Sequence, residues 1–214
     1  MPCIVDIMNV SRTYSAVAPT VDGDVLVVLA RTTQPLTGRR IARLAQRGSV
    51  AAVAKALNRL VGQGLVLRQD APPASLYTLN RRHVAAPTVE TMATIRTELL
   101  DRLRQAFSSW STPPVHASMF GSAARQDGDI DSDIDIFLIR PAGVSDEDAT
   151  WSEQLHDLGD SILAWTGNHA SIIDFAEQDL RQMHDESPPV LADLRRDGID
   201  LAGAPLRELL GGTR

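Results

Sequence analysis

Two short segments of the chain carry residue types that bind phosphate and metal ions. Gly121-Ser122 follows an apolar run at residues 115–120, which predicts a strand that ends in a tight turn. Glycine lets the backbone approach a phosphate closely, and the serine hydroxyl and the amides after it can bind phosphate oxygens. After a spacer of ten residues, Asp133 and Asp135 alternate with isoleucines in a second predicted strand, 133–139. Because alternate residues of a strand share a face, both carboxylates point to the same side.

Two neighbouring carboxylates repel each other unless a divalent cation neutralises them. Oxygen ligands of this kind suit Mg²⁺ or Mn²⁺. A phosphate-binding turn beside a metal-binding strand therefore predicts phosphoryl or nucleotidyl transfer. The alternative is an acidic loop that only faces solvent or binds Ca²⁺. An EF-hand needs glycine at its sixth position and glutamate at its twelfth, and neither falls in place counting from Asp127, Asp129 or Asp131. We interpret these three aspartates as solvated.

The combined motif resembles the signature of polymerase β-like nucleotidyltransferases, in which Gly-Ser, a spacer of about ten residues and Asp-x-Asp follow one another. Here the Asp-x-Asp lies within the run SDIDI. The likeness is closest to the minimal nucleotidyltransferases of bacteria and archaea, and looser to kanamycin nucleotidyltransferase. Ala124-Arg125 fits the small-Arg pair usual in the minimal group, whereas Gln126 replaces the glycine that commonly follows. The resemblance covers about residues 88–205.

This resemblance implies a third carboxylate on a neighbouring strand. The β-rich run HASIIDFA, residues 169–176, follows a predicted helix at 146–165 and contains Asp174 at the expected position. By resemblance, Asp133, Asp135 and Asp174 are the catalytic and metal-binding residues, and Asp174 is the base that takes the acceptor's proton. Glu177 is the reserve candidate. Gly121, Ser122 and Arg125 are the nucleotide-binding residues implied, although Arg125 fits a structural ion pair equally well.

The two halves of the chain differ in charge. Residues 1–85 hold eleven Lys or Arg against four Asp or Glu, and the remainder holds ten against 23. Such asymmetry indicates two domains with different partners, one of them polyanionic. Unequal solvated surface is the alternative. We expect the domains to be residues 1–85 and 86–214.

The basic half predicts three helices and a hairpin. Apolar spacing indicates helices at 24–33, at 36–46 and from Ser49 to about residue 63, with Ser49 as the N-cap of the third. Two short apolar runs around a turn rich in proline predict a hairpin at 65–79. This order resembles the winged helix-turn-helix of many bacterial transcription regulators.

The winged-helix resemblance implies DNA binding through the third helix and the hairpin, with a purely protein-binding module as the alternative. The DNA-binding candidates are polar or basic residues of the helices and the hairpin: Arg39, Arg40, Ser49, Lys55, Asn58, Arg59 and Arg68.

The expected fold is α+β: an N-terminal winged helix, a long amphipathic helix at 88–110, and a polymerase β-like domain with a small mixed sheet flanked by helices. The expected activity transfers an NMP from an NTP, with ATP preferred, to a hydroxyl on a protein, a tRNA or other RNA, or a small molecule. The alternative is a transcriptional regulator or antitoxin, within a toxin–antitoxin module, whose domain binds nucleotide or a partner without turnover. A single cysteine excludes an internal disulfide. The sequence has no apolar run of about 20 residues, so we expect a cytoplasmic protein that does not enter a membrane. We also expect the protein to form a homodimer, which is usual for regulators with a winged helix.

Overall fold

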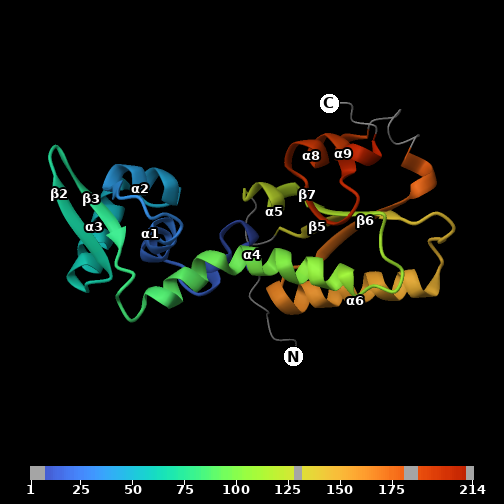
Figure 1. Cartoon of the computed structure of the whole chain (residues 1–214), viewed down its shortest axis with the longest axis horizontal. Helices are drawn as coiled ribbons and strands as arrows, with labels where there is room; N and C mark the ends of the chain where they lie inside the picture. Colours follow the sequence, from blue (N-terminus) through green and yellow to red (C-terminus); the bar gives the residue numbers. More distant parts are fainter. Residues whose placement is uncertain (1–7, 128–131, 181–187, 211–214) are drawn as a thin grey trace. The chain divides into compact units, whose positions relative to one another are not determined.

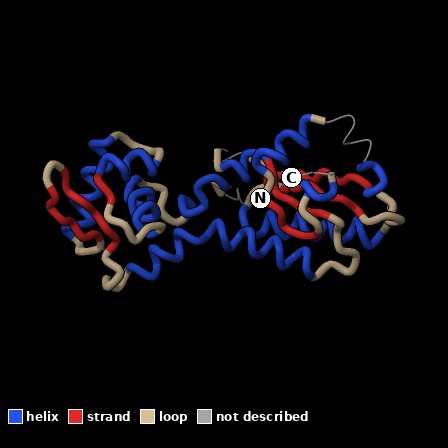
Figure 2. The backbone as a smooth tube through the Cα atoms, turned by 45° about the horizontal axis from the view of Figure 1, so that its top comes forward, coloured by secondary structure: helices blue, strands red, loops and turns tan. Residues whose placement is uncertain are grey.

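The computed structural model describes residues 8–127, 132–180 and 188–210. The chain divides into two compact units, one formed by residues 13–97 and the other by residues 1–12 together with 98–214. The dividing point at residue 97 falls inside helix α4 (Ala86–Ser108), and each unit is described by itself (Figures 1 and 2). Among the described residues, no helix is long and apolar enough to cross a membrane.

The N-terminal unit contains three helices and a three-stranded antiparallel sheet. In chain order these are α1 (Val21–Ala30), β1 (Leu36–Thr37), α2 (Gly38–Ala45), α3 (Val50–Gly62), β2 (Val66–Ala71) and β3 (Ala74–Leu79). The strand order is β1-β3-β2. The hydrophobic core lies between the helices and the sheet and includes Val25, Ile41, Val53 and Leu57.

Sequence patterns located the helices of this unit, with corrections to the bounds of two of them. The helix expected at 24–33 is α1, which begins and ends three residues earlier. Ser49 caps α3 as predicted, because its hydroxyl accepts a hydrogen bond from the Ala52 amide at 3.1 Å. The helix expected at 36–46 begins only at Gly38. Thr37 is extended and accepts a hydrogen bond from the Arg40 amide, so it caps α2, and Leu36 pairs with Tyr77 of β3 instead.

The second unit is built on a mixed four-stranded sheet of order β6-β5-β4-β7. Its strands are β4 (His116–Phe120), β5 (Ile134–Arg140), β6 (Ala170–Ala176) and β7 (Ile199–Gly203). β4 is antiparallel to β5 and to β7, whereas β5 and β6 are parallel. The remaining elements are η1 (Val10–Ala16), which the division at residue 12 cuts, then α5 (Gly121–Arg125), α6 (Ala149–Thr166), η2 (Glu177–Asp179), α8 (Pro189–Asp197) and α9 (Leu206–Leu209). The mixed α+β class and the small mixed sheet confirm the expectation.

Helices cover both faces of this sheet. α4 and α6 lie side by side on one face, and α8 and α9 lie on the other (Figure 1). Ile134, Ile136 and Leu138 of β5 pack on the face that carries α6, which we call the α6 face. Phe137 and Ile139 pack on the face that carries α8, which we call the α8 face. Strand alternation therefore assigns every β5 side chain to one of two different layers.

Candidate active site

The turn between β4 and α5 contacts Asp135 directly. Gly121 has φ +68°, a left-handed conformation that glycine adopts without strain. A Cβ built on Gly121 would lie 3.0 Å from Asp135 Cγ and would collide with Asp135 Oδ2. Only a residue without a side chain allows the turn to meet the carboxylate here. The sequence motif is thus assembled at one point: the backbone of Gly121-Ser122 beside the side chain of Asp135.

Asp135 lies on the α8 face of the sheet. Its side chain is on the same side of β5 as those of Phe137 and Ile139, which pack against α8. Phe120 of β4 is its partner in the β4–β5 pairing. Asp133 precedes β5 by one residue and is exposed. The start of β5 is fixed by Asn168, whose amide donates to the Ser132 carbonyl at 3.0 Å, and by the Ile134 amide, which donates to His169.

The environment of Asp135 disfavours its ionised form. Burial raises the pKa of Asp135, and the negative charge of Asp133 raises it further, with a smaller contribution from Asp193 of α8. A hydrogen bond from Ser171 and the positive charge of Arg125 act in the opposite direction. A cation bound between the two carboxylates would relieve this repulsion.

Arg125 is held in ion pairs beside the turn. Its Nε donates to Asp127 Oδ2 at 2.9 Å, and its Nη1 lies 3.5 Å from Asp197 Oδ2. Both of the roles expected for Arg125 remain compatible with this position, and the structural ion pair is present. Asp127 is exposed, as expected for a solvated acid, whereas Asp129 and Asp131 lie outside the described residues.

The structure does not bring Asp174 to Asp133 and Asp135. In the parallel β5–β6 pairing, Asp135 is level with Ser171 and Leu138 is level with Asp174. Asp174 is therefore on the α6 face, with Leu138, and three positions farther along the strand, roughly 10 Å at 3.3 Å per residue. Among the described residues, no three His, Cys, Asp or Glu side chains form a group that could hold a metal ion.

Asp174 has other partners instead. Both of its oxygens accept from Arg140 Nη1 at 2.8 Å, and Oδ2 also accepts from Trp151 Nε1 at 2.5 Å. Trp151 is fully buried under α6. The reserve candidate Glu177 is also distant from Asp135, because it follows the opposite end of β6 and accepts from the Ala142 amide at 3.0 Å.

Sequence reasoning missed Ser171 and the acids of α8. In the run 170–175 the polar residues Ser171 and Asp174 are three positions apart and lie on opposite faces of the strand, so residue type does not reveal which face is turned to Asp135. Asp193 and Asp197 belong to an ordinary amphipathic helix, and only its packing against α5 brings them near the turn. No sequence signal distinguished them.

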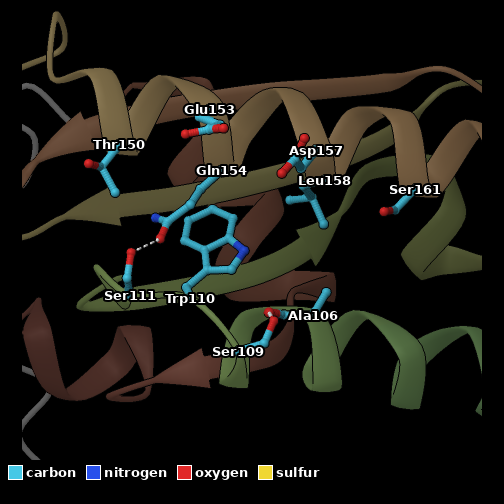
Figure 3. A pocket seen from close by; sticks show the side chains of 10 residues that line it. All are labelled: Ala106, Ser109, Trp110, Ser111, Thr150, Glu153, Gln154, Asp157, Leu158 and Ser161. Carbon is cyan, nitrogen blue, oxygen red and sulfur yellow. Dashed lines mark hydrogen bonds between the residues drawn. The ribbon is translucent and has the colours of Figure 1, made fainter.

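A separate hollow of about 330 Å³ lies between α6 and the end of α4 (Figure 3). Trp110 and Gln154 line it, and Gln154 accepts from the Ser111 hydroxyl at 2.9 Å. Leu158, another lining residue, belongs to the core on the α6 face. The hollow is thus separated from Asp133 and Asp135 by the sheet and takes no part in the site around Gly121.

The candidate DNA-binding residues fall into two groups. All seven are exposed. Three already have partners: Ser49 caps α3, Arg59 is paired with Asp22 of α1, and Arg68 Nε donates to Asp70 at 2.9 Å. Arg39 and Arg40 of α2, and Lys55 and Asn58 of α3, form the other group, for which no ion pair is found among the described residues.

Comparison with known proteins identifies one part of the chain. Residues 98–185 match the family model described as a nucleotidyltransferase domain, which covers α4 from Glu98, both motif strands and β6. No curated protein matches the chain. A solved structure of a mutant of Lactococcus lactis ZitR is similar at 26% identity, with a TM-score of 0.34. The similarity covers 42% of this chain and 61% of that one.

Proposed function

Because residues 98–185 match the family model described as a nucleotidyltransferase domain, we propose that the protein transfers an NMP from an NTP, preferably ATP, to an acceptor hydroxyl. The observation that carries this proposal is the contact between the Gly121 backbone and the Asp135 carboxylate. It unites a turn suited to phosphate with carboxylates suited to a divalent cation. A triphosphate could therefore bind the turn and a metal ion together.

The residues present fit Mg²⁺ or Mn²⁺ held with a nucleotide. Mg²⁺ is usually bound by one or two carboxylates together with substrate phosphates and water. Asp133 and Asp135 supply two carboxylates on one face. The pKa of Asp135 is raised because its carboxyl group is partly buried and is repelled by the negative charge of Asp133. A bound ion would neutralise charge on the triphosphate.

The chain's own groups would hold the NTP in place. The Gly121-Ser122 backbone and the Ser122 hydroxyl bind phosphate oxygens, and Arg125 contributes positive charge beside them. The acceptor hydroxyl releases its proton to water, its oxygen forms a bond to the α-phosphorus, the bond from this phosphorus to the oxygen that joins it to the β-phosphorus breaks, and pyrophosphate leaves. The acceptor is a hydroxyl of a protein, an RNA or a small molecule.

The N-terminal unit supports a second part of the proposal, a DNA-binding winged helix. Its helix, strand, helix, helix, strand, strand order and its antiparallel sheet suit this module. The exposed group formed by Arg39, Arg40, Lys55 and Asn58 would contact DNA, with Arg68 on the hairpin reaching phosphates. DNA binding would then locate the enzyme or regulate its own expression.

One observation favours a second candidate function, nucleotide binding without turnover in a transcriptional regulator or antitoxin. Asp174 lies on the α6 face, where Arg140 and Trp151 donate hydrogen bonds to it, so it is not available as a base at Asp135. A site with fewer carboxylates binds nucleotide but lacks one group for proton transfer.

The test is incubation with each α-³²P-labelled NTP, Mg²⁺ or Mn²⁺, and fractions of protein, RNA and small molecules. Asp133→Asn and Asp135→Asn remove charge from the site. Asp160→Asn is the matched control, since Asp160 is exposed on α6 and, within the described part of the chain, its ion pair is with His156 on the same helix. Label in one fraction that is lost with the first two variants, but kept with the control, supports transfer. Nucleotide binding without label would refute transfer and favour the regulator.

A further inference from the structure

Ser171 is the β6 residue closest in register to Asp135. The two are level in the parallel pairing, and residues at one level of neighbouring strands share a face. The Ser171 side chain is hydrogen-bonded to Asp135. Ile173 and Phe175, which have the same parity, pack on the α8 face as Asp135 does. The group beside the metal-binding carboxylate is thus a neutral hydroxyl.

No other carboxylate of β6 can take this place. Asp174 is the only acid within β6, and it is on the opposite face. Asp174 is held there by three hydrogen bonds that it accepts from Arg140 and Trp151. The Asp174 side chain is only 14% exposed, and the Arg140 side chain only 10%. Moving Asp174 to the α8 face would require β6 to slip by one residue against β5. This slip would also move Ile172 to the α8 face and Ile173 to the α6 face.

Within the described residues, the two motif carboxylates on the α8 face match one divalent ion. Two ions 3.5–4 Å apart, as in two-metal phosphoryl-transfer sites, need carboxylates that bridge and surround them. Asp133 and Asp135 provide two negative charges, enough for one ion whose remaining ligands are phosphates and water. The negative charge of Asp193 of α8 makes a smaller contribution at Asp135, and Asp193 forms no metal-binding group with Asp133 and Asp135 among the described residues.

We infer that the site binds one divalent ion per nucleotide, and that Ser171 is the residue that limits it to one. An aspartate at position 171 would extend a carboxylate beside Asp135 and create the place for a second ion. This inference rests on the proposed function, because it concerns the same site. Asp174 is then a structural residue of the α6 face.

The experiment measures bound Mn²⁺ and bound nucleotide by equilibrium dialysis with α,β-methylene-ATP, which cannot be cleaved at the α-phosphorus. The full chain should retain one Mn²⁺ per nucleotide. Ser171→Asp should retain two, and the electron paramagnetic resonance signal of the ions should broaden because they lie close together. Ser171→Asn, which adds similar volume without charge, should retain one. Asp174→Asn should also retain one.

Each outcome decides between the alternatives. Two Mn²⁺ per nucleotide on the unchanged chain would overturn the inference, as would one Mn²⁺ on a folded Ser171→Asp variant. If Ser171→Asp does not fold, the count on the unchanged chain decides alone. Failure of the proposed function looks different: no nucleotide would be retained, or Asp133→Asn would leave retention unchanged.

Discussion

Asp174→Asn tests whether this residue stabilises the fold or takes part in the reaction. Asp174 accepts two hydrogen bonds from Arg140 and one from Trp151. Asparagine keeps the shape but loses the charge and replaces one acceptor oxygen with an NH₂ group that cannot accept. The Arg140 guanidinium would remain, 10% exposed, without its counter-charge.

The magnitude follows from this burial. Removing one partner of a buried ion pair costs about 3–5 kcal/mol, because a charge is left uncompensated. Since Asp174 is 14% exposed, some water reaches the pair, and we expect the lower end, about 3 kcal/mol. For a unit of this size, each kcal/mol lowers Tm by about 3 °C, so Tm should fall by about 9 °C.

The assay is thermal unfolding followed by circular dichroism. The double variant Arg140→Met/Asp174→Leu should recover most of the loss, because removing both charges leaves neither buried alone. Below its Tm, Asp174→Asn should still bind metal and nucleotide as the unchanged chain does. An unchanged Tm together with lost metal binding would refute the reasoning and return Asp174 to the active site.

Three further predictions concern other parts of the molecule. Gly121→Ala should weaken NTP binding about tenfold in calorimetry, because the added Cβ collides with the Asp135 carboxylate. Gly143→Ala is the matched control, with φ +85° but nothing within 4 Å of the added Cβ, and should leave binding unchanged. Arg39→Ala/Arg40→Ala should weaken DNA binding and reduce the slope of log K against log salt by about 2, and an unchanged slope would exclude these contacts. Burial lowers the pKa of His116, so the unfolded chain binds its proton more readily; stability should be complete above about pH 6.5 and fall as pH decreases below it, a dependence that His116→Gln should reduce in pH-dependent denaturation.

Much of the fold could be predicted because local physics determines it. The helical spacing in α3 and the hydroxyl of Ser49 fix where that helix begins. The alternation around Asp135 places both motif carboxylates on one face. The positive φ and close contact of Gly121 explain why glycine is needed at this turn. The sequence therefore predicted that the Gly121-Ser122 turn lies beside the strand of Asp135, and the structure has Gly121 against the Asp135 carboxylate.

The position of Asp174 depended on tertiary structure. Alternation separates the side chains of β6 into two sets, but it does not say which set faces Asp135. That choice depends on the register between β5 and β6, which are joined through α6 and not by a tight turn. A shift of one residue exchanges the two faces. Packing of Ile173 and Phe175 against the α8 face and of Trp151 against Asp174 selects the register that places Ser171, not Asp174, beside Asp135.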